Sequence, residues 1–441
     1  MAPLRWSPLQ RAMLLLLLLP AGRSSAADPA VAVAFSCDVN APEETLLTPE
    51  YGAARLDATG TAVAINVAGD RVLVGATGRN EVLVIQREIC DGPCWTPSGV
   101  LNGDAYGGIN FDARLGSSVS CSADGVSAVV GAPGDGAAGE LAGSTFVYEE
   151  SGGIWRTAAR LLATDAAATD LFGCAVAMSP DGQVVVVGAR GRDELPSSGT
   201  FRLMDSGAAY VFVRGTDSRG TNGWLLARQQ KLLASDGPIR GDGFGSAVAI
   251  ASSGMIVVGA PNHNEGAGAV YVYRTVDGEH WLPGEKLTVV TESLVGAPPD
   301  ANRPGFGNAL SFSIEPPDTL LVSASADTPS SVQRNAGAVY VYTRRLEPDG
   351  SESWIAGHTL FAGSAAKAYD FFGHSVAVSA DGSSAVVGAH MTDIMVRALS
   401  FRVATRATAS AVALLFNAQI AGIGSGSTRS LETLVLQRTQ A

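Results

Sequence analysis

The chain has 441 residues, and its 42 acidic side chains exceed its 30 Lys and Arg, which gives a formal charge of −12. Only 16% of the residues are charged, 46% are hydrophobic and 52 are glycine. An acidic chain without a Lys/Arg block is not expected to bind nucleic acid, and the hydrophobic content excludes general disorder. Frequent glycine between short apolar runs favours strands joined by tight turns.

The N-terminal segment predicts a secretory signal peptide over residues 1–26. Arg5 and Arg11 come before a short apolar run that ends at Pro20, and small residues follow it. A basic flank, a short apolar core and a small-residue cleavage site are typical of such signals. The run is shorter than the roughly 20 residues of a membrane span, and a retained anchor is the alternative. We therefore expect a secreted or cell-surface protein, with residues 27–45 as a leader and no membrane insertion after cleavage.

The cysteines are consistent with an oxidising compartment, where disulfides persist. Cys90 and Cys94 flank a three-residue turn, which predicts a local disulfide. Cys37, Cys121 and Cys174 cannot all pair within one chain, so at least one thiol is buried or pairs with another molecule. The Cys90–Cys94 spacing also occurs in metal sites, but no second Cys/His pair completes one. No metal or cofactor is expected.

A six-fold internal repeat is the most informative feature of the sequence. A Phe-Gly pair recurs, followed by an alternating run, a turn and a second apolar run that usually ends in Gly-Ala. From the glycine of the first pair to this end point the spacing is 15, 15, 15, 14, 16 and 15 residues. The fifth unit ends in Ser-Ala instead. The starting pairs are Thr59-Gly60, Leu115-Gly116, Phe172-Gly173, Phe244-Gly245, Phe306-Gly307 and Phe372-Gly373.

Each unit predicts four short strands. The dipeptides Asp124-Gly125, Asp181-Gly182 and Asp381-Gly382 predict type I′ hairpins between the first two strands. A third run alternates β-branched and aromatic residues, as in 268–273 and 337–342. A tryptophan then opens a fourth segment in five units: Trp95, Trp155, Trp224, Trp281 and Trp354.

Four antiparallel strands in each unit predict an all-β fold, a β-propeller of six to seven four-stranded blades over residues 46–390. The alternative is a solenoid of β-arches, which the predicted hairpins disfavour because they require antiparallel neighbours. We expect the repeated phenylalanine to pack between blades, and the following glycine to allow close backbone approach.

The Phe-Gly and Gly-Ala-Pro pattern, complete in Gly131-Ala132-Pro133 and Gly259-Ala260-Pro261, resembles FG-GAP repeats, which are the units of the integrin α-subunit propeller. The resemblance spans about residues 46–390. It implies a propeller, usually seven-bladed, that acts as an extracellular binding surface.

Three departures from this family pattern bear on function. The loops between first and second strands lack the Asp-rich calcium ladder of integrins, so Ca²⁺ is not expected there. Leu46-Leu47-Thr48 resembles the fourth strand of a blade and predicts a detached strand that completes the last blade and closes the ring. Residues 391–441 lack the third-strand motif and predict an irregular tail, for which packing on the ring is one interpretation.

Polar residues gather in two sets of loops that the strand directions place on one face of the disc. They are the candidate ligand-binding residues, because functional residues concentrate on loops, and solvated turn residues are the alternative for each. Arg240-Gly241-Asp242 matches an integrin-binding tripeptide, but its position before a Phe-Gly pair favours a structural role. The candidates are Asp135, Glu140, Asp170, Arg192, Asp193, Glu194, Asp242, Asn262, His263, Asn264, Glu265 and Asp370.

The sequence carries no catalytic motif: the five histidines form no HExxH pair, and a Gly-x-Ser-x-Gly elbow and a phosphate loop are missing. We therefore expect a non-enzymatic module that binds protein or polysaccharide. A propeller-fold polysaccharide lyase or hydrolase is the alternative and predicts a pair of carboxylates, or a carboxylate and a histidine, at the channel mouth. A structural repeat of a wall matrix is a third interpretation.

Overall fold

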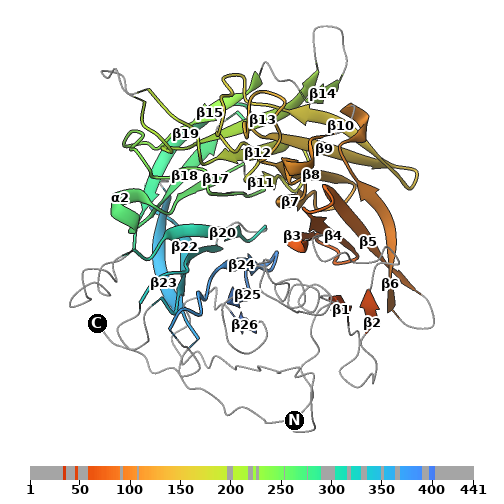
Figure 1. The fold of residues 1–441 in the computed structure, drawn as a ribbon. Coiled ribbons are helices and arrows are strands. Elements are labelled where there is room, and N and C mark those ends of the chain that lie inside the picture. Colours follow the sequence, from red (N-terminus) through yellow and green to blue (C-terminus); the bar gives the residue numbers. More distant parts are fainter. Residues whose placement is uncertain are drawn as a thin grey trace, which may run out of the picture.

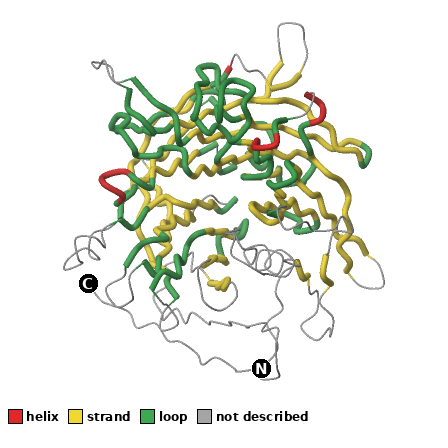
Figure 2. Tube along the Cα trace, in the orientation of Figure 1, coloured by secondary structure: helices red, strands yellow, loops and turns green. Residues whose placement is uncertain are grey.

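The computed structural model describes residues 33–35, 45–47, 58–89, 93–106, 109–195, 202–216, 222–224, 228–252, 254–275, 277–289, 303–314, 319–328, 335–348, 352–362, 368–389 and 397–402. Strands make up most of the described chain, and helix is confined to short segments (Figure 2). They include η1 (Asp104–Tyr106), η2 (Phe111–Ala113) and α2 (His263–Gly266). Within the described ranges, no helix has the length and apolar character needed to cross a membrane.

Six antiparallel sheets follow one another along the chain, one for each predicted repeat. We number them blades 1 to 6. The third strand of blade 3 pairs with two short strands, β14 and β15, in place of one long fourth strand. The strands are β3 (Thr59–Ile65), β4 (Arg71–Ala76), β5 (Glu81–Ile89) and β6 (Pro93–Leu101) in blade 1; β7 (Ser118–Cys121), β8 (Ser127–Ala132), β9 (Ser144–Ser151) and β10 (Ile154–Leu161) in blade 2; β11 (Ala175–Met178), β12 (Val184–Ala189), β13 (Ala208–Thr216), β14 (Asn222–Trp224) and β15 (Gln230–Leu232) in blade 3; β16 (Ala247–Ile250), β17 (Ile256–Ala260), β18 (Ala269–Thr275) and β19 (Trp281–Leu287) in blade 4; β20 (Phe306–Phe312), β21 (Thr319–Ala324), β22 (Ala338–Leu346) and β23 (Glu352–Leu360) in blade 5; and β24 (Ser375–Val378), β25 (Ser384–Ala389) and β26 (Arg397–Arg402) in blade 6.

The blades are arranged around a centre in chain order, from β3–β6 in orange to β24–β26 in blue (Figure 1). The first strand of each blade lies innermost, and β3, β7, β11, β16, β20 and β24 contact one another in this order. The prediction of an all-β propeller is confirmed. The β-arch solenoid is wrong, because neighbouring strands within each unit pair antiparallel.

The hydrophobic core lies between blades. Val129 and Val147 of blade 2 pack in one cluster with Phe172 and Val185 of blade 3. The Phe172 ring lies 5.5 Å from the Tyr210 ring in an edge-on arrangement. Burying such a side chain contributes about 1.5–3 kcal/mol, so the repeated phenylalanine joins blades 3 to 6 each to the one before it, as its position in the sequence predicts, and Leu115 has this position in blade 2.

Glycine follows this phenylalanine because the backbone there is left-handed. Gly116, Gly173, Gly245, Gly307 and Gly373 all have φ between 90° and 94°, a region that residues with a Cβ rarely adopt. The preceding phenylalanines form parallel bridges to glycines at the start of the third strand of the blade before, at Gly143, Gly207 and Gly268. The start of each first strand is therefore fixed against its neighbour by backbone contacts.

The hairpins between first and second strands exist, but their predicted turn type is wrong. In the turn after Ser122, Gly125 has φ 73° while Asp124 is not among the residues with positive φ, and type I′ requires positive φ at both. Ser122 N donates to Ser127 O, and Gly125 N donates to Ser122 O at 3.0 Å. Four residues therefore form the loop, with a glycine after a tight turn.

Both ends of the ring depart from the repeat pattern. The predicted detached strand at Leu46-Leu47-Thr48 corresponds to β2 (Thr45–Leu47). It pairs with β1 (Val33–Phe35) and with no described strand of blade 6, so the described strands do not show the predicted closure of the ring. Among the described strands, β26 is the outermost of blade 6, pairing with β25 from Ala389 to Ser384. β26 lies beyond the predicted propeller boundary at residue 390. Blade 6 thus has a third strand that the sequence analysis did not place.

Candidate functional site

Two sets of loops lie together on one side of the propeller, which we call the loop face. One set joins second to third strands, and the other joins each fourth strand to the next blade. Gly191 N donates to Asp170 O at 3.1 Å, and Asn262 N donates to Asp242 O at 3.2 Å. Because each bond links the two loops of one blade, the candidate residues share this face as the strand directions predict.

A Tyr–Asp–Lys triad occurs at the same place in blades 3 and 4. Tyr210 and Lys231 are partners across β13 and β15, and Tyr271 and Lys286 are partners across β18 and β19. In blade 3 the Tyr210 hydroxyl donates to the Asp165 carboxylate at 2.9 Å, and Lys231 donates to the same carboxylate at 2.8 Å. In blade 4 Tyr271 and Lys286 donate to Asp236 at 2.8 and 2.6 Å.

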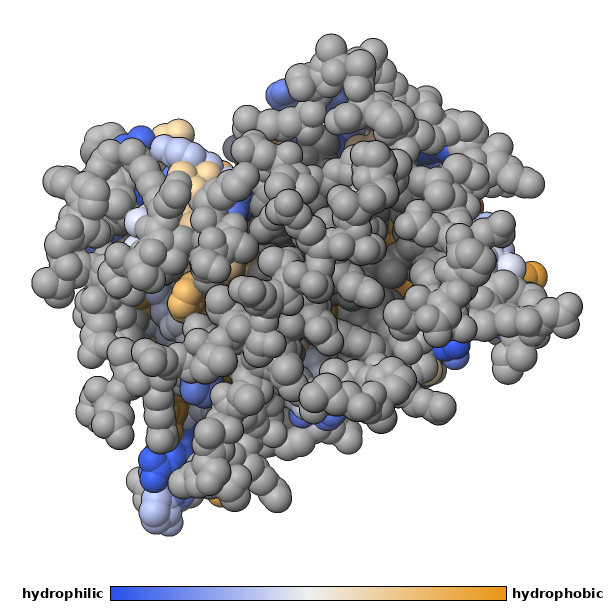
Figure 3. All heavy atoms as spheres, turned by 90° about the horizontal axis from the view of Figure 1, so that it is seen from below, coloured by the Kyte–Doolittle hydropathy of each residue, from blue (hydrophilic) through white to orange (hydrophobic). Residues whose placement is uncertain are grey.

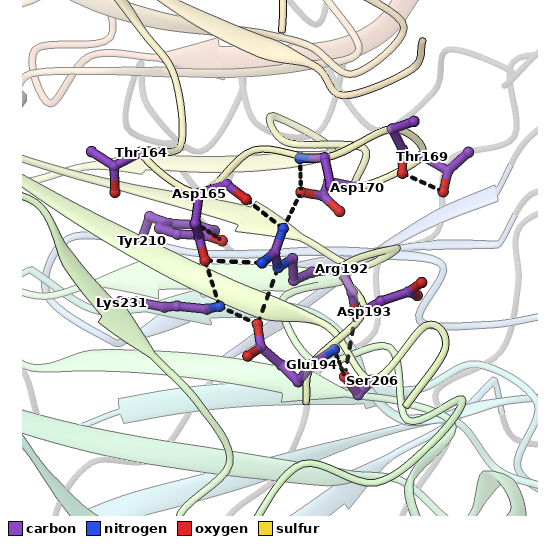
Figure 4. Close-up of polar contacts among 12 residues, drawn as sticks. Thr164, Asp165, Thr169, Asp170, Arg192, Asp193, Glu194, Ser206, Tyr210 and Lys231 are labelled. Carbon is purple, nitrogen blue, oxygen red and sulfur yellow. Dashed lines mark hydrogen bonds and ion pairs between the residues drawn. The ribbon is translucent and has the colours of Figure 1, made fainter. Parts of the chain in front are cut away.

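Arg192 is the centre of the blade 3 cluster, which comprises Asp165, Asp170, Arg192, Glu194, Tyr210 and Lys231 (Figure 4). Its guanidinium binds Asp170 at 3.0 Å, Asp165 at 3.1 Å and Glu194 at 3.1 Å. Glu194 also binds Lys231, so one carboxylate lies between two cations. The guanidinium side chain is 12% exposed. With three carboxylate partners, Arg192 holds these loops together.

The electrostatics of the blade 3 cluster follow from burial and pairing. Burial raises the pKa of Asp165, but hydrogen bonds from Lys231 and Tyr210 outweigh it and leave that pKa below its ordinary value. Burial also raises the pKa of Asp170, and here the bonds from Ala167 and Arg192 do not fully offset it. Asp165 therefore stays ionised more readily than Asp170.

The blade 4 cluster, Asp236, Asp242, His263, Tyr271 and Lys286, has a histidine where blade 3 has Arg192. His263 Nδ1 lies 2.6 Å from Asp242, and its Nε2 lies 2.8 Å from Lys286 Nζ. Burial raises the pKa of Asp242. The hydrogen bond to His263 lowers it by less, so the pKa stays above its ordinary value. Asp242 is 3% exposed and His263 is 7% exposed.

Blades 2 and 5 carry reduced versions of the same arrangement. Asp135 in blade 2 is buried and binds Arg160, and it accepts a bond from Ser144. Asp327 in blade 5 is buried and accepts a bond from the Tyr340 hydroxyl at 2.6 Å. These acids share the position three residues after the alanine of the Gly-Ala or Ser-Ala pair. Each is a link between the second-to-third loop and the strands beneath it.

The predicted site residues fall into a buried and a more accessible group. The structure brings together Asp170, Arg192 and Glu194, and separately Asp242 and His263. Asp193 accepts a bond from Asp205 N at 3.0 Å. The expectation of a solvated ligand surface does not fit the buried residues, because their polar atoms lie inside the loops. Buried are Asp135, Asp170, Asp242, His263 and Asp370; half-buried are Arg192, Asp193 and Glu194; exposed are Glu140, Asn262, Asn264 and Glu265.

Sequence reasoning missed the strand and loop partners of these residues. Asp165, Asp236 and Lys231 carry much of both clusters. The signal that predicts them is a second repeated motif at the end of the fourth strand. Residues 160–165 read Arg-Leu-Leu-Ala-Thr-Asp, and residues 231–236 read Lys-Leu-Leu-Ala-Ser-Asp.

The Arg-Gly-Asp tripeptide is part of the blade 4 loop. Asp242 points its carboxylate at His263 inside the blade, and Gly241 N donates to Met204 O at 2.9 Å. Of the two charged residues, only Arg240 is exposed. The structural role that the sequence favours for this tripeptide agrees with its geometry.

The hairpin aspartates on the opposite side hold their own turns. Asp181 accepts from Ser179 Oγ at 2.5 Å and from Gln183 N at 3.0 Å, and Asp381 accepts from Ser379 Oγ at 2.6 Å. Within the described ranges, no three His, Cys, Asp or Glu side chains are placed to hold a metal ion.

The two described thiols are free. Cys121 and Cys174 form no disulfide, and burial raises the pKa of Cys121 to about 12. The predicted Cys90–Cys94 bridge lies outside the described residues, as does Cys37.

One hollow in the described part of the chain lies beside β15, the short outer strand of blade 3. It measures about 610 Å³ and opens beside the exposed ion pair of Arg228 and Glu279, which are 3.3 Å apart. On the side seen in Figure 3, hydrophilic and hydrophobic described residues both reach the surface. The hollow is lined by Val213, Arg228, Gln229, Gln230, Lys231, Glu279 and His280.

A comparison with known protein families agrees with the repeat pattern. The family model described as FG-GAP repeat matches residues 155–212 and 226–273. The chain is similar to the β-propeller domain of Cps50 (Swd1) from Myceliophteria thermophila, at 10% identity and a TM-score of 0.43, over 75% of this chain and 80% of that one. It is also similar to a functionally unknown protein from Desulfotomaculum acetoxidans DSM 771, at 12% identity and a TM-score of 0.45, over 77% and 81%. No curated protein matches the chain.

Proposed function

We propose that this FG-GAP repeat β-propeller protein is a secreted or cell-surface binding module without catalytic activity, which recognises protein or polysaccharide through its loop face. The signal-peptide pattern of residues 1–26 supports export. Integrin-like use of the loop face is the role that the family resemblance suggests.

One observation supports the proposal: on the loop face, the buried residues that hold the loops in place are different from the exposed residues that could contact a ligand. The buried acids Asp135, Asp170 and Asp242 bind Arg160, Arg192 and His263, and so fix the loops to the strands. Exposed polar side chains then project from loops that are already held: Glu140, Asn262, Asn264 and Glu265. A rigid loop with exposed polar side chains binds at low entropic cost, which favours recognition.

A second candidate function is the polysaccharide lyase or hydrolase, and one observation favours it. Asp242 and His263 form a carboxylate–histidine pair, and burial raises the pKa of Asp242, as in many acid catalysts. Both side chains are nearly inaccessible, however, and they lie against β18 and β19, the outer strands of the blade. A substrate would need to displace the α2 loop to reach them.

The test is binding of the mature chain, from residue 27, to glycan arrays and to extracellular protein libraries. Loop-face variants Asn262→Ala and Glu265→Ala should weaken binding of a captured ligand by about five- to thirtyfold. Glu279→Ala, an exposed change on the opposite side, is the matched control and should leave binding unchanged. Turnover of an arrayed polysaccharide that Asp242→Asn abolishes would favour the enzyme. A ligand sensitive only to Glu279→Ala would place recognition elsewhere.

A further inference from the structure

The loops between the second and third strands of blades 3 and 4 carry charged or titratable residues at matching sequence positions, but the side chains lie differently in the two blades. Arg192 and His263 both stand three residues after the alanine of the Gly-Ala pair, and Glu194 and Glu265 both stand five residues after it. Beneath them lie the same Tyr–Asp–Lys triad and the same aspartate before Phe-Gly. Blade 3 therefore shows what the blade 4 loop does when a cation occupies its central position.

In blade 3 the glutamate lies inside the cluster. Glu194 binds both Arg192 and Lys231, so the two cations are separated by a carboxylate. The cluster contains three carboxylates, from Asp165, Asp170 and Glu194, and two cations. This arrangement avoids a direct contact between like charges, which is costly in a half-buried site.

In blade 4 the equivalent glutamate is outside. Glu265 is exposed, and His263 Nε2 lies directly against Lys286 Nζ at 2.8 Å. An ammonium has only donors, so Nε2 accepts, and the imidazole is neutral with its Nδ1–H directed at Asp242. Asn264 and Glu265 hold φ of 52° and 61°, although neither is glycine. Such left-handed residues store strain that the surrounding contacts must hold.

Adding a proton to His263 makes its contact with Lys286 untenable. Both nitrogens become donors, and two positive charges meet at hydrogen-bond distance. Tyr271 and Lys286 already occupy Asp236, whose carboxylate is 3.8 Å from Nε2, and Asp242 is bound to Nδ1. Among the described residues of the next loop, Arg303 packs on Gly266 and is a cation. Glu265 has the sequence position of Glu194, the carboxylate that separates the two cations in blade 3.

We propose that protonation of His263 draws Glu265 from solvent to a place between His263 and Lys286, which converts the blade 4 loop to the arrangement of blade 3. The movement relieves the left-handed backbone at Glu265 and changes the exposed surface formed by Asn262, Asn264 and Glu265. Acidification thus remodels one loop of the loop face. The switch belongs to the fold and operates with any ligand or none.

The test follows the loop and the imidazole together between about pH 8 and about pH 5, the range in which an imidazole changes charge. Ring ¹⁵N shifts, assigned with His263→Gln, report the proton. Amide hydrogen exchange of residues 262–268, corrected for its intrinsic pH dependence, reports the loop. We expect exchange to slow by about tenfold as the ring is protonated, while residues 190–195 of blade 3 do not change.

Three variants separate this switch from simpler explanations. Glu265→Gln, an exposed change, should abolish the slowing, and His263→Arg should make the loop slow at both pH values. His280→Gln removes an exposed imidazole 2.7 Å from Asp277 and should leave the response intact. A loop unchanged while the ring titrates, a ring that stays neutral to about pH 5, or a response that survives Glu265→Gln but is lost in Asp236→Asn would each overturn the proposal.

Discussion

Gly188, at the end of the second strand of blade 3, lies directly against the carbonyl oxygen of Gly245, which starts blade 4. A Cβ added to Gly188 would overlap this oxygen. The same relationship joins Gly75 to Gly116, Gly131 to Gly173 and Gly259 to Gly307. The Phe-Gly and Gly-Ala elements of the repeat are therefore two halves of one contact between neighbouring blades.

Replacing Gly188 by alanine should destabilise the protein by about 1–3 kcal/mol, because the added methyl forces two backbones apart. Gly188 is not among the glycines with positive φ, so its backbone conformation suits alanine and the clash is the cause. Gly223→Ala is the control, since a Cβ there has nothing within 4 Å. Urea unfolding of both variants is the measurement, and equal effects would contradict the contact as the reason for the motif.

Replacing Arg192 by methionine should cost about 3–5 kcal/mol of unfolding free energy, because it leaves the buried Asp170 carboxylate without its cation, while Asp165 and Glu194 keep Lys231. Arg228→Met is the matched control. It removes an ion pair whose side chains are 50% and 54% exposed, and such pairs contribute at most about 1 kcal/mol. If both changes cost the same, the blade 3 cluster is not a brace.

Asp327 should give the protein a stability that declines as pH rises. Burial raises its pKa in the folded state, more than the bond from Tyr340 lowers it. An acid with a raised folded-state pKa stabilises the fold fully below its unfolded pKa of about 3.9, and this contribution is lost as pH rises through the folded-state value.

Asp327→Asn mimics the protonated acid and removes this dependence. The unfolding free energy of the variant minus that of the native protein should therefore increase between about pH 3.5 and about pH 7. Urea unfolding at a series of pH values measures it. A difference that stays constant, or that shrinks over this range, would argue against the sign derived from burial.

The Arg-Gly-Asp tripeptide should be silent in the folded protein and active only when unfolded. Recognition of it requires the aspartate carboxylate, which here binds His263 at 2.6 Å inside blade 4. In a solid-phase assay, an integrin that recognises the tripeptide should bind a synthetic peptide of residues 236–246 but not the native chain. Binding to the native chain that Asp242→Asn abolishes would show the opposite.

The ring itself follows from the sequence because its determinants are local and repeated. The left-handed φ of Gly173 or Gly245 needs a residue without a Cβ, and this requirement marks the start of each blade, 14 to 16 residues before the Gly-Ala or Ser-Ala pair. The type of hairpin turn was harder to predict because Asp-Gly suits two turns. At Ser179-Pro180-Asp181-Gly182, the serine hydroxyl binds the aspartate and favours the four-residue loop.

The candidate site was less predictable because its contacts are remote along the chain. Asp170 is buried by Arg192, 22 residues later, and Glu194 is held by Lys231, 37 residues later. An acid before Phe-Gly looks like a solvated turn residue until these partners are placed. The third strand of blade 6, residues 397–402, carries no repeat motif, so pairing with β25 alone identifies it.

The glycine contacts between blades restrict amino-acid substitution at the blade junctions more than in the loops. A junction in which two backbones touch admits no side chain unless its partner moves. Blade 5, with Ser323 at this point, is an exception, and there the hydroxyl accepts a bond from Ala309 N at 2.8 Å. In the loops above the junctions, Gly134 and Gly191 are restricted in the same way, whereas positions such as Gly237 and Gly241 have open space beside them. New binding specificities can therefore arise by substitution and insertion on the loop face while the ring beneath keeps its geometry.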